Sequence, residues 1–458
     1  MASKKFFNIS PGRILLASFI FVILAGTLLL CLPQARHVNI PFIDILFTAT
    51  SATCVTGLHV LPMTYFTLFG QCVILALIQI GGLGLMTLSF FLISLIMNLK
   101  LITKLVAGQL LEFEFFTKIK TFLTLIIGMT FISELIGTIV LYFPLREFLE
   151  PKAAIFHAAF NSVSAFCNSG TSLLPNNLID YSQRPLILLP LAALIFMGGI
   201  GFVVWYEIGT NIYNSFKKKT KEEEREEEEL GVRTTLSLHT KIVLTTSAIL
   251  VALGTISFFL LEQHNAIKDF GIINKIVNAI FMSTTTRTAG FNTINVSQLS
   301  LPTLFIIIIL MFIGASPNST GSGIKTTTFT LFLATILCIV FKNKNDVELY
   351  GRKLPTDQIY RATIIVALGL SWVGIITFIL LLTDKNFTFI QIVFEAVSSF
   401  STSGLSTGIT PHLSPLGKIT IMVSMLVGRI GSLTLVLALI SQKKTQLYSY
   451  PEERVIIG

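Results

Sequence analysis

The chain has 458 residues, of which 53% are hydrophobic and 12% are charged, and its formal net charge is +9. A typical soluble domain carries about 25% charged residues, so this chain cannot cover a water-facing surface and most of its surface must face lipid. The composition excludes a cytoplasmic enzyme, a disordered chain and a secreted disulfide scaffold, and the lack of a basic stripe with interleaved aromatic residues argues against nucleic-acid binding.

Eight apolar segments are long enough, or nearly so, to cross a bilayer as a helix, which takes about 20 residues. In chain order they are residues 14–32, 66–97, 121–143, 185–210, 241–261, 301–341 (interrupted), 362–383 and 416–440. Four shorter apolar segments lie between them, and their length suits re-entrant helices rather than spans. These shorter segments are residues 42–54, 154–167, 274–287 and 388–401.

Lysine and arginine are distributed unevenly between the two sides of these segments. One side holds 22 of the 33 basic residues, the loops of the other side hold eight, and three fall at membrane depth. The richer side consists of residues 1–13, 98–120, 211–241, 342–361 and 441–458. The positive-inside rule therefore predicts a multi-pass cell-membrane protein with both termini in the cytoplasm, in agreement with an even number of spans. The charge run Lys217–Glu229 is interpreted as a solvated cytoplasmic insert.

A short motif recurs after each of the four shorter segments. The copies align without gaps at residues 53–57 (TCVTG), 166–170 (FCNSG), 286–290 (TRTAG) and 400–404 (FSTSG). A small hydroxyl side chain stands six residues before each glycine, and another glycine follows 24–28 residues after it. The hydroxyl residues are Ser51, Ser164, Thr284 and Ser398. One such cluster could be an ordinary turn, but four in register indicate one unit repeated four times.

The repeated unit has the chemistry of a cation pathway. A strand that turns its carbonyl oxygens toward a central axis needs unusual backbone angles, which glycine adopts without steric cost. Rings of carbonyls can replace the hydration shell of K⁺, and the negative end of the preceding short helix favours a cation there. We therefore predict an all-α polytopic membrane protein with four tandem span–pore helix–span repeats around a pseudo-fourfold central pore, and eight spanning helices.

The predicted repeats differ in one place. They cover residues 14–98, 118–213, 241–341 and 361–440, and a cytoplasmic tail follows at 441–458. In the third repeat, residues 301–313 offer only about 20 Å of helix before a polar stretch at 314–325, so the second span is interrupted. Ile324 occupies the position where a phosphate-binding loop requires glycine, so nucleotide binding is not expected there.

The four motif glycines, the four repeated units and the interrupted sixth span resemble the Trk/Ktr/HKT superfamily of potassium transporters, over nearly the whole chain. The length and short loops are most similar to the membrane subunit of a bacterial Ktr system. The resemblance implies potassium uptake through a filter of backbone carbonyls. It also implies K⁺ selectivity, because members that favour Na⁺ have Ser at the position of Gly57. The implied filter residues are Val55, Thr56, Gly57, Asn168, Ser169, Gly170, Thr288, Ala289, Gly290, Thr402, Ser403 and Gly404.

The same resemblance implies a gate and partners. The 314–325 stretch would be an intramembrane loop that obstructs the pore below the filter; its implied gate residues are Gly314, Ser316, Asn318, Ser319, Thr320, Gly321, Gly323 and Lys325. A cytoplasmic nucleotide-binding regulatory subunit and a homodimer, with the tail at 450–458 as a dimer contact, are further implications. No covalently bound cofactor is expected, and the ion in the pore is K⁺, with Na⁺ as a second candidate and sodium coupling as a corollary.

Arg429 departs from the fourfold pattern. In the alignment of the repeats it matches Gly82, Gly199 and Ala315, so three repeats keep this position small. A cation at membrane depth is costly and faces a partner or a water-filled cavity. We predict that Arg429 belongs to the gate, where it repels K⁺ or donates hydrogen bonds to the loop. The alternative is a structural ion pair, with Glu134 or Glu395 as the partner.

Two other function classes stay open. A polytopic membrane enzyme needs a nucleophile–base pair or a metal cluster at membrane depth, and the six histidines include no HExxH motif and no close pair. A secondary transporter with broken helices around a midplane site usually shows two inverted repeats rather than four parallel units. An ion bound on a fourfold pseudo-axis would separate these classes from a pore.

Overall fold

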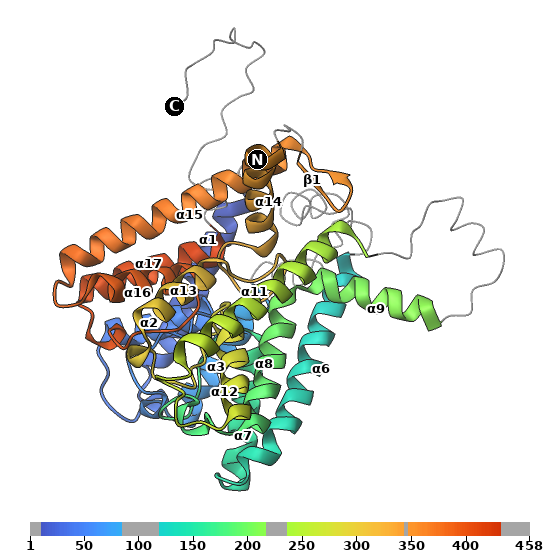
Figure 1. Cartoon of the computed structure of the whole chain (residues 1–458). Helices are drawn as coiled ribbons and strands as arrows, with labels where there is room; N and C mark the ends of the chain where they lie inside the picture. Colours follow the sequence, from blue (N-terminus) through green and yellow to red (C-terminus); the bar gives the residue numbers. More distant parts are fainter. Residues whose placement is uncertain (1–10, 85–118, 217–235, 343–346, 432–458) are drawn as a thin grey trace, which may run out of the picture.

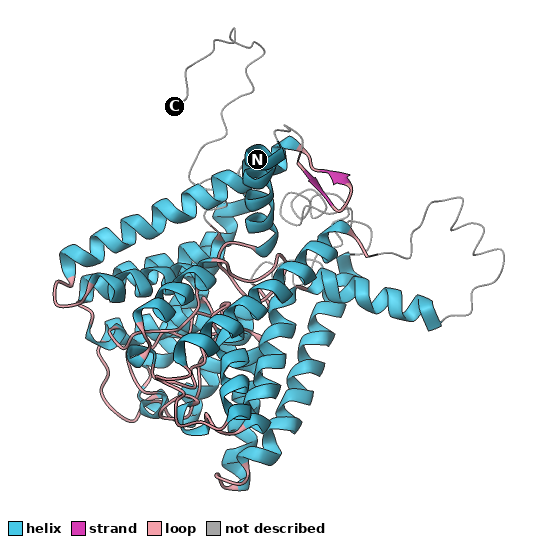
Figure 2. Cartoon of the chain, viewed as in Figure 1, coloured by secondary structure: helices cyan, strands magenta, loops and turns pink. Residues whose placement is uncertain are grey.

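The structure is a computed structural model of the chain, and it describes residues 11–84, 119–216, 236–342 and 347–431. The described residues are almost entirely helical (Figure 2), which confirms the predicted helical class. The exception is a small antiparallel hairpin in which strand β1 (Glu348–Leu349) pairs with β2 (Arg352–Lys353). Figure 2 also places many of the loop segments inside the helical body rather than at its edge.

A short helix occupies each of the four positions where the sequence predicts one. These helices are α2 (Phe42–Thr53), α7 (Pro151–Phe166), α12 (Ile272–Thr285) and α16 (Phe389–Ser401). Proline helps to set two of the starts: Pro41 directly precedes α2, and Pro151 is the first residue of α7, where its missing N–H costs nothing. Each helix ends three to five residues before a motif glycine, so its C-terminal end faces the motif.

The longer apolar segments form helices around these four. They are α1 (Pro11–Cys31), α3 (Leu68–Gly82), α6 (Ile119–Leu145), α8 (Pro185–Ile200), α9 (Phe202–Phe216), α11 (Leu238–Glu262), α13 (Leu301–Phe312), α14 (Thr326–Leu337), α15 (Thr356–Thr383) and α17 (Pro415–Ile430). Within the described part of the chain, α6, α11 and α15 are each long and apolar enough to cross a membrane alone. The second halves of the predicted spans at 66–97 and 416–440 lie outside the described residues.

The prediction of one continuous span at 185–210 is wrong. The chain breaks at Gly201, and α8 and α9 meet at 96°. Gly201 has a φ of 102°, which a residue with a side chain rarely adopts, so the helix ends there for a local steric reason. Figure 1 shows α9 projecting away from α8 and α6. The third repeat is therefore not the only one with a broken second helix, contrary to the sequence-based interpretation.

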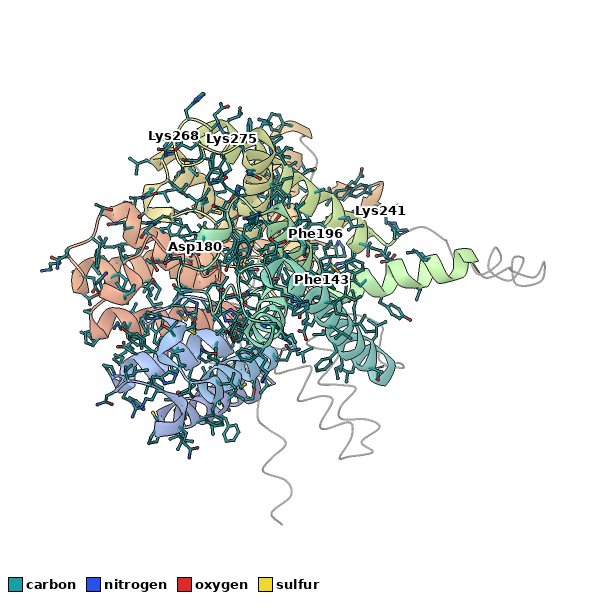
Figure 3. The ribbon with its side chains drawn as sticks, turned by 90° about the horizontal axis from the view of Figure 1, so that it is seen from below. Phe143, Asp180, Phe196, Lys241, Lys268 and Lys275 are labelled. Atoms are coloured by element: carbon teal, nitrogen blue, oxygen red, sulfur yellow. The ribbon has the colours of Figure 1, made fainter. Side chains whose placement is uncertain are left out.

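The helices close into a ring through their packing order. Each short helix packs against the long helix that precedes it, as α1 with α2 and α6 with α7. Each second helix then packs against the short helix of the next unit. These contacts join α3 to α7, α8 to α12, α13 to α16, and α17 back to α2. Figure 3 accordingly shows the blue, teal, yellow and orange-red parts of the chain around a common centre.

An ion pair joins the first and last units of this ring. Asp44 in the first turn of α2 lies 2.7 Å from Lys418 in the first turn of α17, and both side chains are about nine-tenths buried, at 11% and 12% exposed. The pair therefore closes the ring at the junction between the first and the last unit.

Substitution of Lys418 by Met should lower the free energy of unfolding by about 2 kcal/mol, because it leaves the Asp44 carboxylate buried without its partner. The measurement is thermal or denaturant unfolding of the purified protein. The double variant D44N/K418M is the control, and it should recover most of the loss. If the double variant loses as much as the sum of both single variants, the pair does not couple the two units.

Candidate functional site

The four motif glycines lie against one another in a closed ring, which we call the glycine ring (Gly57, Gly170, Gly290 and Gly404). A Cβ atom built on each glycine would collide with the carbonyl oxygen of the residue just before the next glycine. The Cβ of Gly57 would collide with the Ser169 oxygen, and that of Gly170 with the Ala289 oxygen. The Cβ of Gly290 would collide with the Ser403 oxygen, and that of Gly404 with the Thr56 oxygen. The contacts return to their starting point, so the ring leaves no room for a side chain at any of its four positions.

The backbone of each filter segment alternates in handedness. All four glycines have positive φ, between 67° and 82°, and so has the residue two positions earlier in each segment. Those residues are Val55 (φ 55°), Asn168 (60°), Thr288 (70°) and Thr402 (49°). Left-handed residues that alternate with residues of negative φ turn successive peptide groups to one side of the chain instead of to alternate sides. The segments can therefore direct several carbonyl oxygens toward a common centre.

This conformation is strained in three of the four segments. Val55, Thr288 and Thr402 are β-branched, and such residues rarely adopt positive φ, at a cost of roughly 1–3 kcal/mol each. The surrounding structure must therefore enforce it. All twelve predicted filter residues are buried or nearly so, and the glycine ring holds them together. The sequence predicts the glycines here, but not the left-handed residue two positions before each of them.

Hydrogen bonds from the end of each short helix fix the filter segments. In three units, the residue just before the glycine donates its N–H to the carbonyl of the hydroxyl residue six positions before the glycine. The three bonds are Thr56 to Ser51 (2.8 Å), Ser169 to Ser164 (2.7 Å) and Ser403 to Ser398 (2.9 Å). The third unit is shifted by one residue, because Ala289 and Gly290 donate to Thr285 instead. Thr284, the hydroxyl residue six positions before Gly290, donates its hydroxyl to the Ile280 carbonyl inside α12.

The second glycine of each unit has a packing role. Gly81, Gly198 and Gly428 press against the backbone carbonyls at the ends of the short helices α2, α7 and α16, where a Cβ would collide with the oxygen. The carbonyls belong to Thr53, Phe166 and Phe400, each four residues before its filter glycine. In the third unit, Gly314 packs instead against Ser322 of the 314–325 loop. The spacing of 24–28 residues thus reflects close contact between the second helix and the filter support.

Each short helix also buries a phenylalanine that the sequence analysis missed. Phe47, Phe160, Phe281 and Phe394 stand nine or ten residues before the four glycines and are fully buried. Their regular spacing is a signal that the sequence alone contains. They anchor the helices that carry the filter segments.

The 314–325 loop is folded against the broken end of α8. Its two ends are joined, because Gly314 donates its N–H to Ile324 (2.9 Å) and Ile324 to Phe312 (3.2 Å). Three further backbone bonds link the loop to the break after α8. They run from Ser316 to Gly199 (3.0 Å), from Thr320 to Gly198 (3.2 Å), and from Phe202 to Asn318 (2.8 Å). The loop and the bend at Gly201 therefore supply hydrogen-bond partners for each other's backbone N–H and C=O groups. Non-helical backbone that is shielded from water needs such partners.

The loop also touches the filter. A Cβ on Gly321 would collide with the Thr288 hydroxyl and would lie 3.3 Å from the Asn168 side-chain nitrogen, and both residues belong to filter segments. The Thr320 hydroxyl donates to the Phe166 carbonyl at the end of α7 (3.0 Å). Lys325 donates its ammonium to the Gly321 carbonyl (2.7 Å), so it ties the end of the loop back to its middle. The loop thus lies directly against the predicted ion path.

Arg429 joins the loop to the first unit. One guanidinium nitrogen donates to the Thr320 carbonyl and to the Ser322 hydroxyl, and the other donates to the Gly81 carbonyl at the end of α3. The structure therefore places Arg429 against the loop. Of the two kinds of acceptor expected there, a loop carbonyl is present (Thr320), whereas Ser316, Asn318 and Ser319 are not acceptors. A planar fork with several donors suits this bridging geometry better than a point charge would.

The alternative ion pair for Arg429 is wrong. Glu134 accepts a hydrogen bond from the Gln79 amide (3.2 Å). Glu395 accepts from the Thr407 N–H (3.1 Å) and from the Thr410 hydroxyl (2.9 Å). Both carboxylates are thus held by neutral donors away from Arg429. The predicted tail at 441–458 and the charge run at 217–229 lie outside the described residues.

Comparison with known proteins gives a consistent result. The sequence profile of the family described as TrkH, a cation transport protein, matches residues 8–448. The Ktr system potassium uptake protein B of Vibrio alginolyticus is 35% identical over 97% of this chain and 94% of its own length. The protein of the same description from Bacillus subtilis (strain 168) is 34% identical over 99% and 98%. The potassium/sodium uptake protein NtpJ of Enterococcus hirae is 32% identical over 98% of both chains.

The fold has a solved counterpart as well. The crystal structure of the potassium transporter TrkH from Vibrio parahaemolyticus matches with a TM-score of 0.71, covering 95% of this chain and 86% of that one. The sequence identity across this match is 17%, so it bears on the architecture alone.

Proposed function

Because the chain belongs to the TrkH family of cation transport proteins, we propose that it takes up K⁺ across the cell membrane through the glycine ring. It is a transport protein and not an enzyme, as the family assignment confirms. The observation that carries the proposal is the closed ring itself, in which four backbone segments meet with their glycines in mutual contact. Backbone carbonyls arranged in this way can replace the water around K⁺.

The proposed architecture has four repeats and eight spans, with both termini in the cytoplasm. The cyclic packing of α3, α8, α13 and α17 against the short helices of the following units supports a pseudo-fourfold arrangement. The excess of basic residues on one side supports the orientation. In the third unit, α14 resumes after the 314–325 loop, so α13 and α14 together can form one interrupted span.

The proposed gate is the 314–325 loop held by Arg429. The contacts of Gly321 with the filter segments and the two-sided bridge of Arg429 support this role. A cation beside the path would also repel K⁺ where the loop crosses it. We further propose a cytoplasmic nucleotide-binding regulatory subunit and a homodimer, on the basis of the similarity to Ktr proteins. Na⁺ remains the second candidate ion, since one relative is described as a potassium/sodium uptake protein.

The function is tested by expressing the chain in a bacterial host that lacks its own K⁺ uptake systems. We expect growth and Rb⁺ or K⁺ uptake at low external K⁺, with or without a co-expressed regulatory subunit. Flux into liposomes that contain the purified protein removes the dependence on host proteins. Membrane-inserted, folded protein that gives no K⁺ flux in either assay would contradict the proposal.

Substitution of Gly57 by Ser should raise the ratio of Na⁺ to K⁺ permeability. The new side chain would collide with the Ser169 carbonyl at a φ of 82°, so it displaces the carbonyls that fit K⁺. The matched control is Gly374→Ser, because a Cβ at Gly374 meets nothing within 4 Å. The measurement is the reversal potential or the relative uptake of the two ions. Unchanged discrimination in the folded Gly57→Ser variant would remove Gly57 from the filter.

A further inference from the structure

Arg287 is a buried cation beside the third filter segment. It stands three residues before Gly290, directly after the end of α12, and its side chain is 7% exposed. Its described partners are both on Ser247 of α11: the hydroxyl at 3.2 Å and the backbone carbonyl at a long 3.5 Å. The guanidinium Nε has no hydrogen-bond partner. A guanidinium has five donors, so most of its capacity is unused.

No carboxylate neutralises this charge within the described part of the chain. Three other buried carboxylates accept hydrogen bonds from neutral donors instead. The donors are Gln79 to Glu134, Thr407 and Thr410 to Glu395, and the N–H and hydroxyl of Ser300 to Glu262. A buried charge without a counter-charge costs several kcal/mol, and native proteins normally pair it. Arg287 therefore lacks the partner that its position demands.

Arg287 and its partner Ser247 both line a small cavity. It is lined by Ile195, Phe196, Gly199 and Ile200 of α8, Ser247 of α11, Thr284 of α12, Arg287 and Ala315. Figure 3 shows Phe196 near the centre of the molecule, on the side where α8 meets the third unit. The space holds about one water-sized occupant, so a chloride ion, which is somewhat larger than water, enters only if the lining side chains shift slightly outward. The α8 side of the cavity is apolar, so the polar groups that face it come from Arg287, Ser247 and Thr284.

The surroundings add positive charge. Ala315 of the cavity wall belongs to the 314–325 loop, which also ends in Lys325 and is held by Arg429. Both of those cations donate to neutral groups of the protein rather than to carboxylates. Arg287, Lys325 and Arg429 thus all lie on or next to elements that contact the loop, and none of them has a carboxylate partner in the described part of the chain. The positive charge of this region favours an anion there.

We propose that this cavity binds a single monovalent anion of the size of chloride, held by Arg287 and by the hydroxyl hydrogen of Ser247. The Ser247 oxygen already accepts from Arg287, which leaves its hydrogen to donate. A phosphate group is a poorer fit, because Ile195, Phe196 and Ile200 offer no donors to its remaining oxygens. The anion supplies the counter-charge that the chain lacks, and it stabilises the junction of α8, α11 and α12 next to the filter.

The test compares thermal unfolding of the purified protein in potassium chloride and in potassium gluconate at the same K⁺ concentration and ionic strength. Chloride should raise Tm by about 2 °C or more, in a saturable manner. R287M should lose this dependence, and R287K should keep part of it. The control is R184M, because Arg184 lies outside this cavity, over the Phe148 ring, and should keep the full chloride shift.

Bromide provides a second measurement on the unmodified protein. Crystals grown with bromide in place of chloride should show an anomalous peak beside Arg287, and S247A, which keeps the charge, should need more chloride for the same shift. The bromide and S247A measurements still test the proposal if R287M fails to fold. Equal Tm in the two salts, a chloride shift that persists in R287M, or the lack of a bromide peak in the cavity would each overturn the proposal, with water as the occupant. None of these readouts depends on K⁺ transport.

Discussion

Deletion of residues 316–323 should raise K⁺ uptake by about tenfold, which corresponds to a barrier lower by ~1.4 kcal/mol. The loop lies against Thr288 and Asn168 of the filter, so its removal clears the path on that side. It should also weaken the dependence of uptake on a regulatory subunit, because the element that such a subunit would move is gone. The measurement is Rb⁺ or K⁺ flux in liposomes and in a K⁺-uptake-deficient host.

The deletion has a structural side effect that calls for a gentler variant. It removes the partners of the Gly198 and Gly199 carbonyls and of the Phe202 N–H, so the bend after α8 loses its support. Thr320→Val avoids this, because it removes the hydroxyl bond to Phe166 and leaves the chain length unchanged. Ser319→Ala is its control, since that hydroxyl bonds Ser316 within the loop. If Thr320→Val and the deletion both abolish flux in folded protein, the loop is a structural support and not a barrier.

Arg429→Ala should also increase K⁺ flux by several-fold while the protein stays folded. The side chain bridges the Thr320 carbonyl and the Ser322 hydroxyl of the loop to the Gly81 carbonyl of α3, and its loss frees the loop and removes a cation from the path. Its acceptors are neutral, so the substitution strands no buried carboxylate. We therefore expect a fall in the free energy of unfolding of about 1–3 kcal/mol, the usual cost of hydrogen bonds to a charged group.

Arg429→Lys separates the two contributions of Arg429. Lysine keeps the positive charge but cannot reach two sites with a planar fork. Flux like that of the wild type in this variant would mean that the charge alone limits conduction, whereas flux like that of Arg429→Ala would mean that the bridge does. Gly199→Ala is a useful control at the equivalent position of the opposite unit, because a Cβ there makes only ordinary contacts, at 3.4 Å or more. If Arg429→Ala lowers the free energy of unfolding without raising K⁺ flux, the proposal that Arg429 is part of the gate is wrong.

Features that depend on a local sequence pattern were predicted well from the sequence. The four short helices occur at the expected places because apolar length and the motif glycines are local signals, and the glycine at 24–28 residues proved to mark a contact. The bend at Gly201 was missed because residues 185–206 are apolar on both sides of it, and hydropathy cannot report a reversal of backbone handedness. The positive φ of Val55 and Thr402 was missed for a related reason: β-branched residues favour other conformations, and only the assembled ring imposes this one.

Partners between distant residues were the hardest to predict. Arg429 stood out by its exceptional position in the repeats, and the structure places its guanidinium against the loop. Its acceptors are two backbone carbonyls and the Ser322 hydroxyl, and the sequence has no signature for these contacts. Arg287 is one of the three basic residues at membrane depth, but nothing in the sequence shows that no carboxylate among the described residues reaches it. In both cases the charge was visible in the sequence, whereas its surroundings are set by tertiary packing.

The glycine ring is made by one polypeptide, and this gives it a genetic property that a ring of identical subunits lacks. A single codon change alters one quarter of the ring, so substitutions can be introduced at one, two, three or all four positions in every combination. Because neighbouring glycines touch, the effects of adjacent substitutions should not simply add, whereas those at opposite positions should come closer to additivity. Variants with one, two, three or four substituted glycines can therefore show how many unchanged filter segments are needed for ion selectivity.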